Sequence, residues 1–253
     1  MCRILILLGN NDYNIIYKFL EQSIKPKNTP NIQSKRDADY HLDGFGFAYY
    51  DKKWNIYKNH LLFNKDKNLD NVIKSINSNV IIGHIRAMCN KSNSFPKYEN
   101  THPFIFNNNI WCHNGCICNF DNIKNDFLIN KYKKYIKGKT DSEYLFYYFL
   151  SILDTKKDTI LNNLIETSII FFNKLKSYNT PISANIVYAN NDYILVSRFI
   201  NNDEIPASLY YTINNNKCII SSEPLNEQYN IFPSKTLWII DKKTFNLLVK
   251  INL

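Results

Sequence analysis

The sequence predicts one α+β domain over residues 1–253, made of two packed, mostly antiparallel sheets with helices on their outer faces. Short apolar runs typical of strands fill two stretches, one before residue 113 and one after Pro181. Two helical segments lie between them, and the chain has no internal repeat and no linker that would mark a domain boundary. With 253 residues, 45% of them hydrophobic, it can bury a large core.

The first 112 residues are predicted to alternate strands with helices. The run Ile4 to Leu8 is fully apolar and predicts a buried strand that begins almost at the amino terminus. Apolar side chains recur at helical spacing over 14–24 and 68–78. Further strands are expected at 43–50, 54–62 and 80–82, and 105–112 is expected to be a strand or a hairpin interrupted by its three asparagines, Asn107, Asn108 and Asn109.

The later chain is predicted to hold two helices and then an antiparallel meander. Thr140-Asp141-Ser142-Glu143 has the spacing of a capping box, and the helix behind it, 144–153, is apolar nearly all round. A second, amphipathic helix is expected at 158–175. After Pro181, polar turns separate short β runs that predict the meander, at 183–188, 193–199, 209–213, 218–222, 236–241 and 245–251.

The net charge of +9 is expected to reflect a solvated surface. The lysines are dispersed, and the basic and aromatic pattern of an RNA-binding module is missing. No run approaches a membrane span, and Ile4 to Leu8 is too short for a signal peptide. We therefore expect a cytoplasmic protein with no nucleic-acid or membrane partner, and with reduced cysteines at positions Cys2, Cys89, Cys112, Cys116, Cys118 and Cys218.

Removal of Met1 would make Cys2 an amino-terminal residue with both a thiol and a free α-amine. A thiol is nucleophilic mainly as thiolate, and its ordinary pKa is about 8.5. An α-amine has a pKa of roughly 7.7–8.0, so it can accept the thiol's proton at neutral pH, directly or through a water. One residue then supplies both nucleophile and base.

Four later residues have the chemistry that cleaving an amide of an amino-acid substrate requires. Arg86, at an expected strand end, can bind a carboxylate in a bidentate pair, and Asp141, at a helix start, can hold an ammonium. Asn114 carries an amide donor, and Gly115 lets its backbone N–H approach an oxyanion. Each also has a plainer interpretation: a surface ion pair for Arg86, a hairpin turn for Asn114-Gly115, and part of a helix start for Asp141.

Seven motifs occur in order along the chain: Met-Cys-Arg, Asp-Gly-Phe-Gly, Gly-His-Ile-Arg-Ala, Asn-Thr-His-Pro-Phe, His-Asn-Gly, Thr-Asp-Ser-Glu and Ser-Glu-Pro-Leu. This set, from Cys2 to about Ile240, resembles a class II glutamine amidotransferase domain of the N-terminal nucleophile hydrolase superfamily. It is most similar to the stand-alone branch, which includes γ-glutamyl hydrolases of glutathione or of ergothioneine precursors. Ala87-Met88-Cys89 departs from the residues that often follow the arginine in that family.

The resemblance implies a four-layer αββα sandwich and a role for each candidate. Cys2 would be the nucleophile with its freed amine as base, Asn114 and Gly115 the oxyanion hole, Arg86 the partner of the substrate α-carboxylate, and Asp141 that of the α-amino group. The catalytic motifs would lie within 2–143, followed by the strand-rich part 181–253. Ser222-Glu223-Pro224-Leu225 matches a late motif to which we assign no chemical role.

The implied reaction is attack of the Cys2 thiolate on the γ-amide of glutamine or a γ-glutamyl peptide. A γ-glutamyl thioester forms, and water then releases glutamate, with neither a metal nor another cofactor. The sequence leaves the leaving group open: ammonia from glutamine, or the cysteinylglycine portion of glutathione.

Three alternatives also remain. In the first, a zinc ion is bound by Cys112, His113, Cys116 and Cys118, although four ligands within seven residues of one strand are hard to arrange as a tetrahedron. The chain would otherwise be the glutaminase half of a two-protein amidotransferase that passes ammonia to an accepting protein partner. A third alternative is a catalytically inactive, basic interaction scaffold.

Overall fold

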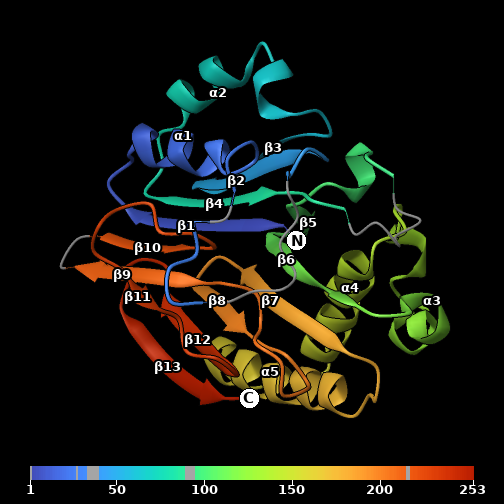
Figure 1. Cartoon of the computed structure of the whole chain (residues 1–253). Helices are drawn as coiled ribbons and strands as arrows, with labels where there is room; N and C mark the ends of the chain where they lie inside the picture. Colours follow the sequence, from blue (N-terminus) through green and yellow to red (C-terminus); the bar gives the residue numbers. More distant parts are fainter. Residues whose placement is uncertain (1, 27, 33–39, 89–94, 215–216) are drawn as a thin grey trace.

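The computed structural model describes residues 2–26, 28–32, 40–88, 95–214 and 217–253. These residues form two stacked sheets with helices on both outer faces (Figure 1). Helices α1 (Tyr13–Glu21) and α2 (Leu69–Ser75) cover the first sheet, and α4 (Asp141–Leu153) and α5 (Ile160–Lys176) cover the second. The predicted four-layer αββα sandwich is therefore confirmed.

The first sheet has seven strands in the order β11-β9-β10-β1-β4-β2-β3, and its described pairs are antiparallel. Its central strand, β1, begins at Arg3 and lies between β10 and β4. The strands span β1 (Arg3–Gly9), β2 (Phe45–Asp51), β3 (Lys53–Asn59), β4 (Val80–Ile85), β9 (Tyr210–Asn214), β10 (Lys217–Ser221) and β11 (Asn230–Ile231).

The second sheet has six strands in the order β13-β12-β8-β7-β6-β5, again antiparallel. Strands β5 and β6 form a hairpin, which is one of the two possibilities expected for 105–112, and Asn107 and Asn108 take positive φ values of 45° and 61° at its turn. The strands span β5 (Phe104–Phe106), β6 (Asn109–Ile117), β7 (Ile182–Ala189), β8 (Tyr193–Arg198), β12 (Thr236–Asp241) and β13 (Leu247–Asn252).

The predicted carboxyl-terminal meander is wrong. Its strands form three hairpins, and the middle one, β9-β10, joins the first sheet beside β1, while β7-β8 and β12-β13 stay in the second. Local alternation identifies strands and hairpins, but it does not say which sheet receives a hairpin. The short strand β11 was not predicted.

Alternating side chains of β1 belong to two different apolar layers. Ile4, Ile6 and Leu8 pack between the sheets, whereas Leu5 and Leu7 pack against α1 and α2. A strand buried on both faces has an uninterrupted apolar sequence, which explains why this strand could be predicted from the sequence. A third layer, rich in aromatic residues, joins the second sheet to α4 and α5.

Several boundaries differ from those expected. Helix α1 ends at Glu21 and α2 at Ser75, each three residues early, because the next residues form turns or extended chain. The described chain also contains short helices, namely α3 (Phe120–Ile123), η1 (Phe63–Lys65), η2 (Tyr98–Asn100), η3 (Lys124–Phe127) and η4 (Lys133–Tyr135). Cys89, most of the expected loop 90–98, and Asn215 and Asn216 lie outside the described residues.

Only half of the predicted capping box forms at α4. The Thr140 hydroxyl accepts the Glu143 backbone N–H at 3.3 Å. The Glu143 carboxylate, however, accepts hydrogen bonds from the backbone N–H groups of Lys137 and Gly138, at 3.0 and 2.7 Å.

Among the described helices, none combines the length and apolarity that a membrane span requires.

Candidate active site

Cys2 directly precedes β1, at one end of the sandwich. Its Sγ atom is 3.4 Å from the backbone nitrogen of Ala87 and 3.6 Å from the carbonyl oxygen of the same residue. Because Arg3 pairs with Ile85 in antiparallel register, Cys2 comes opposite Arg86. Strand alternation gives Cys2 the same direction as Ile4, into the space between the sheets.

The Cys2 thiol is buried, and its surroundings decide its protonation. Burial raises the pKa of the thiol, opposed by the positive charges of the amino terminus and Arg86 and by the Ala87 backbone hydrogen bond. The Asp141 carboxylate adds to the rise, so both Arg86 and Asp141 are near enough to act on the sulfur. A thiol with a raised pKa is protonated at neutral pH and needs a base before it can attack.

Arg86 directly follows β4 and is only 4% exposed, so it is not the surface residue of the plainer interpretation. Its backbone N–H donates to the carbonyl of Gly44 at 2.8 Å, and its own carbonyl accepts from Asp43. The Asp43 carboxylate in turn accepts the Met88 N–H at 2.6 Å. The residues before β2 therefore hold the backbone on both sides of Arg86.

Asn114 and Gly115 lie within β6, opposite Asn185 and Ala184 of β7, so the hairpin-turn interpretation is wrong. Asn114 is 1% exposed and, like Cys112 on the same face, points between the sheets. A Cβ atom on Gly115 would lie 1.9 Å from the Ser183 carbonyl oxygen. Because that neighbour is backbone, no residue larger than glycine fits there.

Asp141 is the first residue of α4, and its carboxylate ties the helix to β6. Oδ2 accepts the Ile117 N–H at 2.8 Å, and Oδ1 accepts the Ser142 N–H at 2.7 Å. A carboxylate at a helix amino terminus is favoured by the helix dipole. Asp141 thus takes part in the helix start, as the plainer interpretation held, and its charge also acts on Cys2.

The late motif to which the sequence gave no role holds strand β1. Arg3 Nε donates to Glu223 Oε1 at 2.7 Å, with the two side chains 1% and 2% exposed. Ser222 Oγ accepts the Ile4 N–H at 2.9 Å, and the Ser222 N–H donates to the Ile4 carbonyl at 3.0 Å. The motif Ser-Glu-Pro-Leu was the available signal for these residues.

Three buried histidines surround the same end of the sandwich. His84 Nε2 donates to the carbonyl of His113 at 3.1 Å, which links the two sheets. Burial lowers the pKa of His84 to about 3, so this ring is neutral. The His84 ring packs on that of His102 with centroids 4.0 Å apart, and His113 Nδ1 lies 2.9 Å from Ser142 Oγ.

The zinc hypothesis has no support in the geometry. Cys112 points into the core between the sheets, whereas the neighbouring His113 points the other way, toward Ser142 of α4. Adjacent strand residues face opposite sides of a sheet and do not converge on one ion. Within the described ranges, no three histidine, cysteine or acidic side chains gather closely enough to hold a metal.

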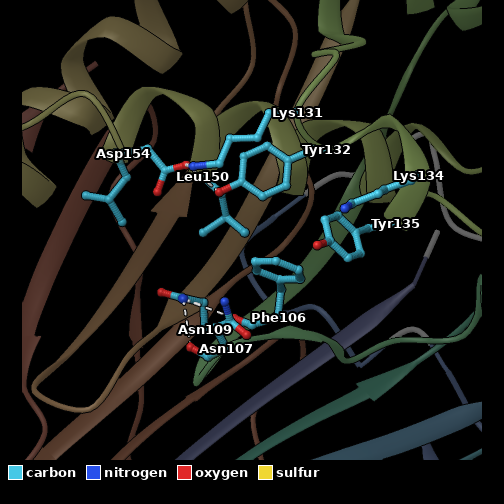
Figure 2. A pocket seen from close by; sticks show the side chains of 10 residues that line it. Phe106, Asn107, Asn109, Lys131, Tyr132, Lys134, Tyr135, Leu150 and Asp154 are labelled. Atoms are coloured by element: carbon cyan, nitrogen blue, oxygen red, sulfur yellow. Dashed lines mark hydrogen bonds and ion pairs between the residues drawn. The ribbon is translucent and has the colours of Figure 1, made fainter.

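A hollow of about 400 Å³ lies at the far end of α4 from Asp141 (Figure 2). Phe106, Tyr132 and Tyr135 form its walls, with Lys134 and an ion pair between Lys131 and Asp154 at its rim. None of the five predicted site residues lines it. These five residues lie instead at the end of the sandwich where β1 begins.

A protein family model and a yeast protein each match most of this chain. Residues 1–216 match the family model described as "Glutamine amidotransferases class-II". A Saccharomyces cerevisiae protein named "Probable glutamine amidotransferase DUG3" is 24% identical over 98% of this chain and 84% of its own length.

Two solved structures are similar in fold. A glutamine aminotransferase class-II domain protein from Silicibacter pomeroyi superposes with a TM-score of 0.66 at 18% identity, over 98% of both chains. Glutamine phosphoribosylpyrophosphate amidotransferase from B. subtilis superposes with a TM-score of 0.63 at 13% identity, and this chain covers 49% of it.

Proposed function

The chain belongs to the class II glutamine amidotransferases, and from that membership we propose that it hydrolyses the γ-amide of glutamine or of another γ-glutamyl compound, with Cys2 as nucleophile. The observation that carries the proposal is the position of the Cys2 thiol. It lies buried directly before the central strand, opposite Arg86 and within electrostatic reach of Asp141.

The first step requires a base, because burial raises the pKa of the thiol. After removal of Met1, the α-amine of Cys2 accepts the thiol proton, and the thiolate attacks the γ-carbonyl carbon. The carbonyl π electrons move onto oxygen, and the Asn114 amide and the Gly115 N–H donate to that oxyanion. The ammonium then protonates the leaving nitrogen as the C–N bond breaks, which leaves a γ-glutamyl thioester.

The second step returns the enzyme to its starting state. Water loses a proton to the α-amine and attacks the thioester carbon, and glutamate leaves as the C–S bond breaks and the thiol is reprotonated. Arg86 holds the substrate α-carboxylate and Asp141 the α-ammonium throughout. Two hydrogen bonds from backbone N–H groups orient the Asp141 carboxylate, which supports a fixed anchor for that ammonium.

The test is glutamate release from glutamine and from glutathione by protein whose amino terminus is verified as Cys2 by mass spectrometry. Release from at least one substrate is expected, and Cys2→Ala should abolish it while the unfolding temperature stays near that of the wild type. Cys118→Ala is the matched control, because this partly exposed cysteine lies beyond the end of β6 and should leave the rate unchanged.

Substantial turnover by Cys2→Ala would refute the nucleophile assignment. Release of ammonia from glutamine alone, increased by an acceptor protein, would instead favour a glutaminase subunit that supplies a partner. If neither substrate yields glutamate and a γ-glutamyl diazo ketone does not label Cys2, the proposal fails in favour of an inactive scaffold.

A further inference from the structure

Ser222 and Asn114 make an incomplete hydrogen-bonding arrangement at the site. Both side chains are buried, at 0% and 1% exposure, and the Asn114 Nδ2 atom lies 3.4 Å from Ser222 Oγ. Among the described residues, the Asn114 Oδ1 atom at the other end of the amide has no hydrogen-bond partner. A buried acceptor without a partner costs about 1–3 kcal/mol, so this arrangement needs a physical reason.

The donors and acceptors can be counted atom by atom. The Ser222 hydroxyl has one proton to donate and two lone pairs, and it already accepts the Ile4 N–H at 2.9 Å. When the Asn114 NH2 group also faces Ser222, both lone pairs are used and the hydroxyl proton finds no acceptor in the described part of the chain. A donor on Ser222 and an acceptor on Asn114 are then both unsatisfied.

A half-turn of the amide removes that mismatch. The oxygen and nitrogen of an asparagine amide have almost the same shape, and the hydrogen-bonding partners determine which occupies each position. With Oδ1 toward Ser222, the hydroxyl donates to Asn114 while it still accepts from Ile4. The NH2 group then lies at the end of the amide that has no protein partner, where it can donate a hydrogen bond to the oxyanion of a bound substrate.

We infer that Ser222 is a positioning residue whose hydroxyl orients the Asn114 amide so that its N–H groups face the reacting carbonyl. This role rests on the proposed function of Asn114. The Ser222 hydroxyl joins three parts of the chain at one atom, since its Oγ contacts both strand β1 through Ile4 and the proposed oxyanion hole through Asn114. Ser222 thereby couples the position of the nucleophile to the orientation of the donor.

The test compares two rates in the same variants. The first is kcat for glutamate release, which needs the oxyanion donor. The second is alkylation of Cys2 by iodoacetamide, which attacks a saturated carbon, forms no oxyanion and reports only on the nucleophile. Ser222→Ala should lower kcat by roughly 10–100-fold, less than the roughly 100–1,000-fold typical of deleting an oxyanion donor, because the amide is still present. Alkylation should change little.

Ser221→Ala is the matched control. Ser221 is the adjacent buried serine, and its hydroxyl donates to the Glu223 carbonyl instead of approaching Asn114. Its kcat should stay near that of the wild type. Equal losses of kcat and alkylation in Ser222→Ala would overturn the inference, because Ser222 would then act only by holding β1, and an unchanged kcat would overturn it as well.

A double-mutant cycle adds a second criterion. In an Asn114→Ala background, Ser222→Ala should have almost no further effect on kcat, because the amide that it orients is gone. If the fold-losses of kcat in the two single variants instead multiply in the double variant, the two residues act independently and the inference is overturned.

A readout that needs no turnover separates this inference from the proposed function. Neutron diffraction from a deuterated wild-type crystal should show the Ser222 deuterium directed at Asn114 Oδ1, even if no γ-glutamyl compound is hydrolysed. An Asn114 ND2 group directed at Ser222 would overturn the inference whatever the activity.

Discussion

The two sheets supply the site in different ways. The first sheet contributes residues at strand ends: Cys2 before β1, Arg86 after β4 and Ser222 after β10. The second sheet contributes Asn114 and Gly115 from within β6. Residues at strand ends can be held by loop contacts, as Arg86 is by Gly44 and Asp43, whereas residues within a strand are fixed by the partner strand.

This difference predicts different sensitivities to substitution. Within β6 the adjoining β7 backbone leaves no space, so a small change must displace a strand. At the ends of the first-sheet strands, buried charge and hydrogen bonds hold the chain, so a change of charge is more harmful than a change of volume.

The largest expected effect is that of Gly115→Ala, because its new Cβ would lie 1.9 Å from the Ser183 carbonyl oxygen. We expect a loss of more than about 4 kcal/mol in the free energy of unfolding, together with loss of glutamate release. Gly83→Ala in β4 is the control, since its Cβ would meet a Phe19 ring carbon at 2.8 Å, and a side chain can move. It should cost about 1–3 kcal/mol.

Urea unfolding of both variants measures the difference. Equal losses for the two glycines would contradict the idea that the second sheet fixes its part of the site by backbone packing.

The next effect concerns the first sheet. Glu223→Gln removes the carboxylate that pairs with Arg3 in the interior, and we expect it to lower the free energy of unfolding by about 3 kcal/mol. Glu166→Gln on α5 is the matched control, because the Glu166 side chain is 54% exposed in its pair with Lys156. It should cost less than about 1 kcal/mol. Comparable losses in thermal unfolding would argue against a special role for the late motif.

The effect that is smallest at neutral pH, because it grows only as the pH falls, concerns the hydrogen bond from His84 that joins the sheets. The pKa of His84 is about 3 in the folded protein, compared with about 6.5 for an unperturbed histidine. Below pH 6.5 the unfolded chain binds a proton that the folded chain does not, so stability falls as the pH falls, by up to about 1.4 kcal/mol per pH unit.

A His84→Gln variant should lose this part of the acid sensitivity between pH 6.5 and about pH 4, measured as unfolding temperature against pH. His60→Gln, at an exposed position, should keep the slope of the wild type. An unchanged slope in His84→Gln would mean that other groups account for the acid sensitivity.

The sequence alone predicted strand β1 and the four longest helices, because apolar periodicity is a local property. For the segment with Asn107 and Asn108 it left a strand or a hairpin open. It also predicted that Arg86 follows a buried strand. It could not show that Asn114-Gly115 lies inside a strand, since the pair is equally typical of a turn and only the partner β7 distinguishes the two.

Tertiary structure alone decided which hairpin joins which sheet and what the late motif does. Insertion of β9-β10 beside β1 brings Ser222 against Ile4 and Glu223 against Arg3, across more than 200 residues of chain. The order of motifs in the sequence is enough to indicate the family, because each motif reflects a local chemical requirement. Their meeting at Cys2 depends on strand pairing between distant segments, whose energy comes from contacts that no single segment contains.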